Sequence, residues 1–344
     1  MKIFTLKLRG NFHAGPKAPS DIVDICVNKF GMKSVILPQA EGALNKIKYR
    51  FKIYSIFLSS FFKGEILVLQ FPMYENSKIL NGLFLFFLGF VRKNRTIVVI
   101  HDIDGLRYND ENILEQDVKR LNKIGYIVVH NERMKKRLEE AGVTSKLYCL
   151  ELFDYLCDKS NKEMKKIFDS KEIKIAYAGN LIEEKSPFLY QLDVAKLKYK
   201  FNLYGVGIEK NLNDMMIYKG KKEPNELPND IEGDLGLVWD GNFDESDEDT
   251  GFKNYTRYNN PHKLSCYLAA GLPVIVWKKS AIAEFVTKNN IGYMISNLYE
   301  INDLDFSDYE KKLMNVQRIK QQVRNGDYTQ NVICRIIKEN NLKD

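Results

Sequence analysis

The segment from Tyr255 to Trp277, YTRYNNPHKLSCYLAAGLPVIVW, holds the arrangement of residues best suited to bind an anion. Its Asn-Pro pair is typical of a helix start, because proline has its φ preset and lacks an N–H that would be unpaired there. Free N–H groups and the helix dipole attract phosphate, and Lys263 adds a full positive charge. An ordinary helix with a surface lysine is the alternative. The residues of this predicted anion site are Asn260, Pro261, His262, Lys263 and Leu264.

Three other segments accompany this one: GLVWDGNF at 236–243, HDIDGLR at 101–107 and AGNL at 178–181. Together with the Pro-x-Lys-Leu helix and the AAGLPVI that follows it, they resemble the donor-site signature of GT-B glycosyltransferases. The likeness is strong over about 234–297 and loose over the first 90 residues. It is nearest to bacterial galactofuranosyltransferases and to the glucosyltransferases that extend N-acetylglucosamine on serine-rich adhesins.

The resemblance implies an α/β fold of two Rossmann-like, doubly wound domains that face a cleft. It also implies an enzyme that moves a sugar, galactofuranose first, from a UDP-sugar to a glycan, lipid-linked or glycoprotein acceptor in cell-surface polysaccharide biosynthesis. The UDP-sugar is a co-substrate, and no cofactor is implied. Two alternatives stay open: a UDP-glucose-dependent glucosyltransferase that extends GlcNAc on a serine-rich glycoprotein, and a non-catalytic UDP-binding subunit. The presence of both Lys185 and Lys263 argues against the non-catalytic subunit.

One position departs from many retaining members of this fold. Those members carry a glutamate five residues before the glycine that ends the helix, where it binds the nucleotide ribose. This chain has Cys266 at that position, five residues before Gly271. A neutral thiol cannot accept hydrogen bonds from two ribose hydroxyls as a carboxylate does. The departure argues against a retaining enzyme of that type and favours the galactofuranosyl and glucosyl relatives.

A second donor element follows an apolar run in the middle of the chain. Gly179 lets a diphosphate approach the backbone closely, Asn180 continues the turn, and Lys185 could pair with the diphosphate. Tyr204 and Tyr218 end later strands on the same side, where a tyrosine could stack on uracil. The alternatives are a commonplace turn after a strand and, for each tyrosine, packing in the core.

Candidates for a general base follow the apolar run TIVVI at 96–100. An inverting sugar transfer needs a base that takes the proton of the acceptor hydroxyl. His101, Asp102 and Asp104 come directly after this run and are the candidates. Capping of the following turns is the alternative for the two aspartates. Arg107 could hold an acceptor phosphate or pair with Asp104.

The loop from Arg9 to Asp21, RGNFHAGPKAPSD, follows the first predicted strand. The resemblance implies that this loop approaches the reaction centre, and its glycines permit close backbone approach. A surface loop without such a role is the alternative. Should the three base candidates fail, Asp21 and Glu75 are the next ones. The cleft-loop candidates are Gly10, Asn11, Gly15 and Lys17.

Two short sequences match the metal-binding Asp-x-Asp motif of the other large glycosyltransferase fold. They are Asp102-Ile103-Asp104 and Asp247-Glu248-Asp249. The second lies in the run DESDED, which is typical of a solvated loop. The first is better placed for Mg²⁺ or Mn²⁺, because it follows a strand. Lysines at a helix start neutralise a diphosphate without a metal, so we expect no metal ion.

Short apolar runs that alternate with helical patterns must position these residues. Strands are predicted at 66–70, 96–100, 126–130, 173–178, 201–204, 215–218, 235–239 and 273–277. Their near-continuous hydrophobicity and spacing predict parallel βαβ units buried on both faces. A Lys-rich polar stretch at 158–171 divides two such series. We predict an N-terminal acceptor-binding domain at 1–157, a nucleotide-sugar-binding domain at 171–306, and helices at 307–344 that pack back on the first domain.

The charge distribution limits the classes of binding partner, and the cysteine content indicates the cellular compartment. Residues 1–100 carry 15 Lys and Arg against 5 Asp and Glu, whereas the remainder carries 37 against 40. Basic character therefore belongs to the N-terminal part, which fits an anionic membrane surface or a phosphate-bearing substrate. No zinc knuckle or helix-turn-helix pattern supports nucleic acid as a partner. Five scattered cysteines without a CxxC indicate a reducing, cytoplasmic compartment.

Two stretches bear on membrane contact. The apolar run at 79–91 has thirteen residues and is shorter than the roughly 20 that a membrane span needs. Basic residues alternate with aromatic ones over 46–62 and could meet anionic lipid at the inner face of the membrane. A plain solvated helix is the alternative, and the aromatic residues could instead form the interface of a homo-oligomer.

Overall fold

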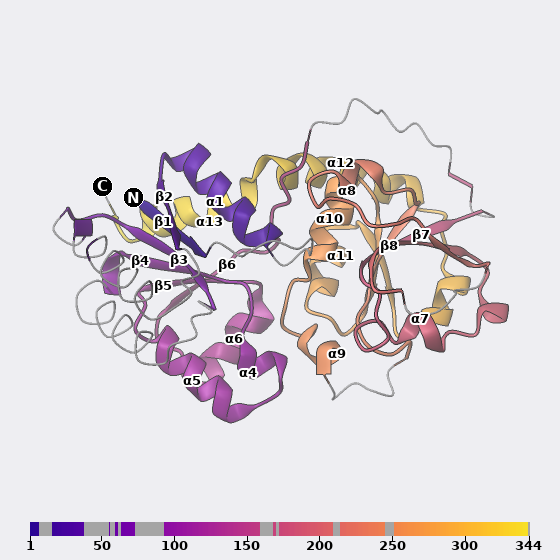
Figure 1. Ribbon diagram of the computed structural model, residues 1–344, viewed down its shortest axis with the longest axis horizontal. Helices are drawn as coiled ribbons and strands as arrows, with labels where there is room; N and C mark the ends of the chain where they lie inside the picture. Colours follow the sequence, from indigo (N-terminus) through magenta and orange to yellow (C-terminus); the bar gives the residue numbers. More distant parts are fainter. Residues whose placement is uncertain are drawn as a thin grey trace. The chain divides into compact units, whose positions relative to one another are not determined.

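The structure, a computed structural model, describes residues 1–6, 16–37, 55, 59–60, 63–72, 93–158, 168–169, 172–208, 214–244 and 251–342. The chain divides into two compact units (Figure 1). The first unit comprises Met1–Leu106, Asp110–Leu150 and Tyr328–Asp344. The second unit comprises Arg107–Asn109 and Glu151–Asp327. Each unit has its own parallel sheet.

The sheet of the first unit has six parallel strands in the order β2-β1-β3-β4-β5-β6. Its strands are β1 (Lys2–Leu6), β2 (Lys33–Leu37), β3 (Leu67–Phe71), β4 (Thr96–Ile100), β5 (Tyr126–Val129) and β6 (Lys146–Cys149). Its helices are α1 (Lys17–Phe30), α4 (Asp104–Arg107), α5 (Glu111–Leu121), α6 (Glu132–Glu140), α13 (Asp327–Glu339) and the short 3-10 helix η1 (Lys93–Arg95).

The sheet of the second unit also has six parallel strands, in the order β12-β11-β10-β7-β8-β9. Its strands are β7 (Lys174–Asn180), β8 (Lys200–Val206), β9 (Met216–Tyr218), β10 (Leu235–Val238), β11 (Val274–Trp277) and β12 (Gly292–Ile295). Its α-helices are α7 (Phe188–Gln191), α8 (Leu227–Asp230), α9 (Gly251–Tyr255), α10 (His262–Ala270), α11 (Ile282–Asn289) and α12 (Tyr309–Asn325). Two 3-10 helices, η2 (Val194–Lys196) and η3 (Leu298–Asp303), complete it.

The strand predicted at the start of the chain is β1, and the eight predicted strands from 66–70 onward are present within about two residues at each end. They form because β-branched and apolar residues follow one another, and the central strands β4, β5, β10 and β11 are buried along their whole length. The predicted helix after β5 is α6. The Asn131 side chain caps it by accepting a hydrogen bond from the Met134 N–H at 2.9 Å. Two Rossmann-like, doubly wound sheets are therefore confirmed.

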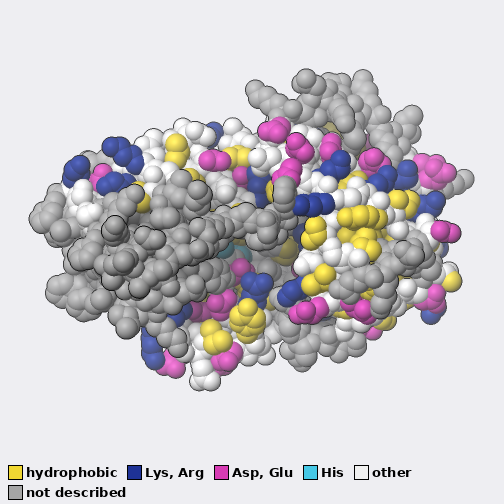
Figure 2. Space-filling model, viewed as in Figure 1, with side chains coloured by type: hydrophobic (Ala, Val, Ile, Leu, Met, Phe, Trp, Pro, Cys, Tyr) yellow, Lys and Arg dark blue, Asp and Glu magenta, His cyan; other side chains and the backbone are white. Residues whose placement is uncertain are grey.

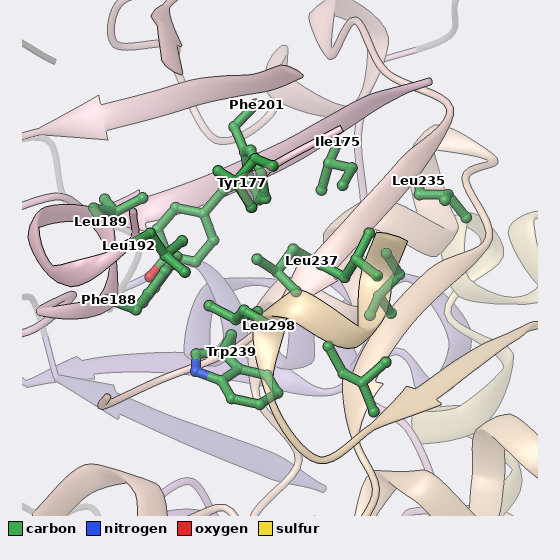
Figure 3. Close-up of a cluster of buried hydrophobic side chains, with 14 of the residues drawn as sticks. Ile175, Tyr177, Phe188, Leu189, Leu192, Phe201, Leu235, Leu237, Trp239 and Leu298 are labelled. Atoms are coloured by element: carbon green, nitrogen blue, oxygen red, sulfur yellow. The ribbon is translucent and has the colours of Figure 1, made fainter. Parts of the chain in front are cut away.

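The core of the second unit is a continuous apolar cluster (Figure 3), and its strand residues alternate along each strand, so they lie on one face of the sheet. Aromatic residues supply much of its volume, and Tyr177, Phe188 and Trp239 are almost fully buried. The Tyr177 and Phe188 rings meet edge to face, with centroids 5.0 Å apart. This packing fixes the carboxyl ends of β7 and β10, from which the polar site below projects.

Helix α10 is fixed at its C-terminal end by side chains of α12. Arg324 Nε donates to the Ala269 carbonyl at 2.7 Å, and Lys320 Nζ lies 3.4 Å from the Ala270 carbonyl. The last carbonyls of a helix have no partner within the helix and carry partial negative charge, so cations stabilise them. Gly271 ends α10 at φ 90°, in the left-handed region that glycine tolerates.

Helix α13 belongs to the first unit, although a single residue separates it from α12 of the second unit. Near its end, Asn340 Nδ2 donates to the Tyr148 hydroxyl at 2.8 Å, and Lys146 Nζ donates to Asn340 Oδ1 at 2.7 Å. The chain thus passes from the first unit to the second after Leu150 and returns at Tyr328.

The surface view in Figure 2 shows side chains of both charge signs interspersed over the described residues, with exposed hydrophobic side chains among them. Within the described part of the chain, no helix is long and apolar enough to cross a membrane. The run at 79–91 and the basic and aromatic residues of 46–62 lie outside the described residues.

Candidate functional site

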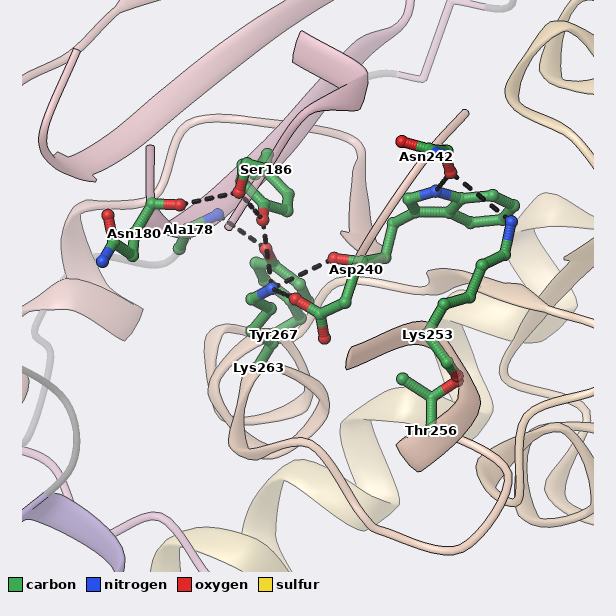
Figure 4. A network of polar contacts seen from close by, with 11 residues as sticks. Ala178, Asn180, Ser186, Asp240, Asn242, Lys253, Thr256, Lys263 and Tyr267 are labelled. Atoms are coloured by element: carbon green, nitrogen blue, oxygen red, sulfur yellow. Dashed lines mark hydrogen bonds and ion pairs between the residues drawn. The ribbon is translucent and has the colours of Figure 1, made fainter. Parts of the chain in front are cut away.

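A lysine in the first turn of α10 is the centre of the candidate site (Figure 4). Lys263 Nζ donates to Asp240 Oδ1 at 2.6 Å, to the Trp239 carbonyl at 3.0 Å and to the Tyr177 hydroxyl at 3.1 Å. It also lies 4.7 Å from the centroid of the Tyr177 ring. The Lys263 side chain is 18% exposed, so a ligand can reach it.

The environment of Lys263 keeps the ammonium group charged. Burial alone would lower the pKa of Lys263, but the Asp240 carboxylate and the Tyr177 hydroxyl outweigh burial and raise this pKa above its ordinary value. The result is a permanent positive charge at the N-terminus of a helix, a position that itself attracts anions.

A chain of hydroxyl groups connects Lys263 to the turn after β7. Ser186 Oγ donates its only proton to the Asn180 carbonyl at 2.6 Å, so the Tyr177 hydroxyl must be the donor in its 2.7 Å contact with Ser186. Burial raises the pKa of Tyr177, which keeps that proton in place. The Tyr177 oxygen then accepts from Lys263. Lys263 is thereby held in one position relative to Asn180.

The structure brings Gly179 and Lys263 together, as expected for one site. A Cβ at Gly179 would lie 3.0 Å from Lys263 Cε, and a Cβ at Gly205 would lie 1.8 Å from the Gly179 carbonyl. Gly205 therefore has no room for a side chain, and a side chain at Gly179 would press on Lys263. The two glycines let the Lys263 side chain and the neighbouring backbone pack closely at the carboxyl ends of β7 and β8.

The cluster lies where the strand order of the sheet reverses. β7 is followed by β8 and β9 on one side and by β10, β11 and β12 on the other. Open α/β sheets bind ligands at such a point, outside the carboxyl ends of the strands. Tyr177 comes from β7, Trp239 and Asp240 come directly after β10, and Lys263 comes from α10.

Tyr267, one helical turn after Lys263, attaches α10 to this point of the sheet. The Ala178 N–H donates to the Tyr267 hydroxyl at 2.7 Å, both groups being buried. A Cβ at Gly236 would lie 2.3 Å from Cγ of Tyr267, so the ring packs directly on the β10 backbone. Tyr267 thus fixes the distance between α10 and the carboxyl end of β7.

We expect Tyr267→Phe to lower the free energy of unfolding by about 1–3 kcal/mol, because the Ala178 N–H would stay buried without an acceptor. Urea unfolding followed by tryptophan fluorescence measures this, since both tryptophans, Trp239 and Trp277, lie in the second unit. Tyr299→Phe is the matched control. Its hydroxyl accepts from the exposed Asp193 N–H, which water can satisfy. Equal effects of the two substitutions would contradict the assigned role of Tyr267.

The two tyrosines predicted to stack on uracil differ. Tyr218 is 49% exposed at the end of the edge strand β9, and its hydroxyl donates to the Gly205 carbonyl at 2.9 Å. Its stacking role stays a prediction. Tyr204 is buried, and its hydroxyl accepts from the Glu232 N–H at 2.8 Å. Stacking by Tyr204 is therefore a wrong prediction, because its ring has no free face.

The other predicted residues at the start of α10 have mainly structural contacts. Asn260 Nδ2 donates to the Glu151 carbonyl at 2.9 Å, and the His262 ring stacks on Tyr155 with centroids 4.7 Å apart. Pro261 is the N-cap residue rather than the first helical one. Leu264 is fully buried and its N–H donates to the Pro261 carbonyl, so a direct ligand contact of Leu264 is a wrong prediction.

Of the remaining donor-site candidates, Asn180 is the last residue of β7 and Lys185 lies in the turn that follows. Asn180 Oδ1 accepts from the Ile182 N–H at 3.1 Å and so stabilises this turn. Lys185 is partly exposed. Cys266, the position that departs from the glutamate pattern, is buried in α10. Ligand contacts of Asn180 and Lys185 stay predictions.

Sequence reasoning missed four members of the cluster, Tyr177, Ser186, Trp239 and Asp240. It also missed Lys253, which is buried with Nζ 4.9 Å from the Trp239 ring and 5.3 Å from the Trp277 ring. Asp240 could have been found, because it directly follows a buried strand at the point of reversed strand order. A pocket next to Asp240 is lined by Val238, Trp239, Asp240, Lys253, Thr256, Pro261, Trp277, Ser280 and Ile282.

In the first unit, the base candidates follow β4. His101 Nε2 lies 2.7 Å from Gln70 Oε1, so Nε2 carries the proton and Nδ1 is the basic nitrogen of the neutral ring. Asp104 begins α4, and Asp102 is partly exposed just before it. The Gly105 N–H donates to Asp117 Oδ2 at 3.2 Å. Arg107 is the last residue of α4.

His130, at the end of the neighbouring strand β5, was not predicted as a site residue. Its Nε2 donates to the Ile100 carbonyl at 3.1 Å. Burial lowers the pKa of His130 to about 4, so the ring is neutral near pH 7. His130 is 1% exposed and therefore fixes the carboxyl end of β4 rather than meeting a substrate.

The loop predicted from Arg9 to Asp21 is shorter than expected, because α1 begins at Lys17. Lys17 is buried and its Nζ pairs with Asp21 Oδ1 at 2.5 Å, one turn along the helix. As a loop residue in the cleft, Lys17 is a wrong prediction. Gly10, Asn11, Gly15, Glu75 and Asp247-Glu248-Asp249 lie outside the described residues. Over the described ranges, no three His, Cys, Asp or Glu side chains are grouped to hold a metal ion.

Comparison with known proteins gives matches to both halves of the chain. Residues 2–152 match the N-terminal domain, and residues 175–336 the C-terminal domain, of the glucosyltransferase 3-like family model. The beta-1,6-galactofuranosyltransferase WbbI of Escherichia coli (strain K12) is 31% identical over 330 residues, which cover 95% of each chain. Glucosyltransferase 3 of Streptococcus gordonii is 23% identical over 283 residues and 80% of each chain.

Solved structures share the fold. Anabaena Alr3699/HepE in complex with UDP has a TM-score of 0.60 at 14% identity, covering 98% of this chain and 100% of that one. The lipopolysaccharide outer core galactosyltransferase WaaB has a TM-score of 0.56 at 12% identity, covering 97% and 99%.

Proposed function

The chain belongs to the glucosyltransferase 3-like family of GT-B glycosyltransferases, and we propose that it transfers galactofuranose from UDP-galactofuranose to a glycan acceptor in cell-surface polysaccharide biosynthesis. The choice of sugar is supported by the relative that is 31% identical over nearly the whole chain, which is named a galactofuranosyltransferase. The use of UDP is supported by the Anabaena structure with the same fold, which was solved with UDP.

The observation that carries the proposal is the position of Lys263. Its charge stands at the N-terminus of α10, beside Gly179 and at the point where the strand order reverses. Helix N–H groups and a lysine together suit the diphosphate of a nucleotide sugar. Tyr218, which is exposed and whose hydroxyl donates to the Gly205 carbonyl, is the remaining candidate for stacking on uracil.

In this proposal the first unit supplies the acceptor side of the reaction. His101, Asp102 and Asp104 follow β4 at the carboxyl edge of its sheet, where a base that deprotonates an acceptor hydroxyl belongs. Arg107, which belongs to the second unit by contacts although it ends α4, would hold a phosphate of the acceptor. Positive charge at Lys263 neutralises the leaving UDP, so the proposed reaction needs no metal ion.

Two other functions differ from this one in ways that can be measured. Glucosyltransferase 3 of Streptococcus gordonii belongs to the same family, which favours UDP-glucose as a second candidate donor. A non-catalytic subunit would bind UDP without turnover. The cytoplasmic location, contact with the inner face of the membrane and a homo-oligomeric state stay predictions.

Release of UDP from a panel of UDP-sugars tests the proposal. We expect UDP-galactofuranose to be hydrolysed or transferred at least tenfold faster than UDP-glucose, UDP-galactopyranose or UDP-N-acetylglucosamine, and EDTA to leave the rate unchanged. Fastest turnover of UDP-glucose would favour the glucosyltransferase instead. Tight UDP binding without turnover of any sugar would favour the subunit, and loss of activity in EDTA would contradict the metal-free reaction.

A further inference from the structure

All three protons of the Lys263 ammonium group are already used within the protein. A lysine has three N–H donors, and here they point to Asp240 Oδ1, the Trp239 carbonyl and the Tyr177 hydroxyl. A diphosphate oxygen can therefore hydrogen-bond to Lys263 only if it replaces one of these acceptors.

Two of the three acceptors are fixed. The Tyr177 side chain is fully buried and donates its own proton to Ser186, so rotation would break two hydrogen bonds at once. The Trp239 acceptor is a backbone carbonyl just after β10, and the Trp239 indole is itself held by the Asn242 carbonyl at 2.7 Å. Neither group can leave Lys263 without moving the core.

Asp240 is the exchangeable acceptor. Its side chain is 26% exposed, and among the described residues Lys263 is the one hydrogen-bond partner of its carboxylate. Because this side chain is partly exposed, the carboxylate can turn toward solvent when another acceptor takes its place. A carboxylate and a phosphate oxygen carry the same sign of charge and make the same kind of charge-assisted hydrogen bond to an ammonium group.

We infer that Asp240 occupies the place of the diphosphate on Lys263 when the site is empty, and that an incoming UDP-sugar must displace it. This inference rests on the proposed function. Asp240 is then a residue that sets nucleotide affinity. It keeps Lys263 paired in the empty site, weakens nucleotide binding because it competes with the diphosphate, and speeds the release of UDP by returning to Lys263.

The substitution Asp240→Asn tests this competition, because the amide keeps the shape of the side chain but removes its charge. We expect the dissociation constant for UDP, measured by calorimetry, to fall about tenfold and the dissociation rate of UDP to fall with it. A charge-assisted hydrogen bond that no longer has to be broken accounts for a change of this size. A carboxylate that instead bound the nucleotide directly would give weaker binding on substitution.

Asp303→Asn is the matched control. It removes the same charge in the same unit, at a side chain that is 84% exposed and 3.9 Å from its partner Lys198. Lys198 precedes β8, so Asp303 lies by the amino end of that strand, whereas Asp240 follows the carboxyl end of β10. We expect UDP affinity to stay within twofold of the unchanged protein.

The UDP complex of the unchanged protein gives a second measurement that needs no variant. In its crystal structure we expect more than 4 Å between Lys263 Nζ and Asp240 Oδ1, with a phosphate oxygen in place of the carboxylate. An unchanged distance of 2.6 Å, or UDP binding by Asp240→Asn that is equal or weaker, would overturn the inference while leaving UDP as the ligand. Failure of the unchanged protein to bind UDP at all would instead remove the proposed function, and the inference with it.

Discussion

Removal of the general base is expected to lower kcat by about 100-fold or more while UDP affinity stays unchanged. Attack by the acceptor hydroxyl requires loss of its proton as the new bond forms, and a positioned base typically contributes about 10²–10⁴ in rate. Asp102→Asn and Asp104→Asn keep the side-chain shape and remove basicity, and His101→Ala removes the third candidate. A loss confined to kcat marks an interaction that is made only in the transition state.

The matched control for these variants is Asp110→Asn. Asp110 caps α5 by accepting from the Asn112 and Ile113 N–H groups, and asparagine caps a helix equally well. We expect its kcat to stay within about twofold. His101 is the candidate with a defined side-chain contact, since its Nε2 lies 2.7 Å from Gln70 Oε1.

Near-normal turnover in all three variants would show that the base lies elsewhere. Asp21, the next candidate from the sequence, is now disfavoured, because its carboxylate is buried and paired with Lys17. Glu75 lies outside the described residues and stays a candidate on sequence grounds alone.

Lys263→Ala is expected to weaken UDP binding by about 10- to 100-fold. One charge-assisted hydrogen bond contributes about 1.5–3 kcal/mol, and each 1.4 kcal/mol corresponds to a factor of ten. The substitution also leaves Asp240 with an uncompensated charge that repels the diphosphate. Because Asp240 is 26% exposed, water can solvate it, and we expect the fold to persist.

Calorimetry with UDP measures this effect, and Lys222→Ala is its control. Lys222 is a comparably charged side chain in the same unit that pairs with Asp230 at 3.1 Å on the surface. Its removal should change UDP affinity by less than twofold, because exposed charges are screened by salt. Unchanged UDP affinity in Lys263→Ala would contradict the assignment of a phosphate site to the N-terminus of α10.

The sequence predicted the central strands well but missed three of the four edge strands. TIVVI and PVIVW are buried on both faces, so hydrophobicity alone marks them. The strands β2, β6 and β12, which the sequence reading missed, have four or five residues, as the central strands β4, β5, β10 and β11 do. β6 is exposed or partly exposed at three of its four residues, and all three strands lie at sheet edges, where pairing rather than composition defines a strand.

The site was predictable as a location but not as a set of contacts. Gly179 and Lys263 could be placed in one site, because each lies in a segment at the carboxyl end of a parallel strand. The partners of Lys263 could not, since they depend on which way side chains point from three separate elements. Tyr204 and Tyr218 show the same limit: both end strands, but β8 lies inside the sheet and β9 at its edge, so one ring is buried and the other exposed.

The chain crosses between the two units twice, and this affects how segments can be exchanged with those of related proteins. Residues 1–150 lack α13, whose Val332, Ile333 and Ile336 are buried in the complete protein. A fragment cut only at 150 would lose that cover from its sheet, and the complementary fragment would carry an uncovered apolar helix. A hybrid protein with a foreign first unit therefore needs two junctions, one near Leu150 and one near Asp327, so that the terminal helix stays with the unit to which it belongs.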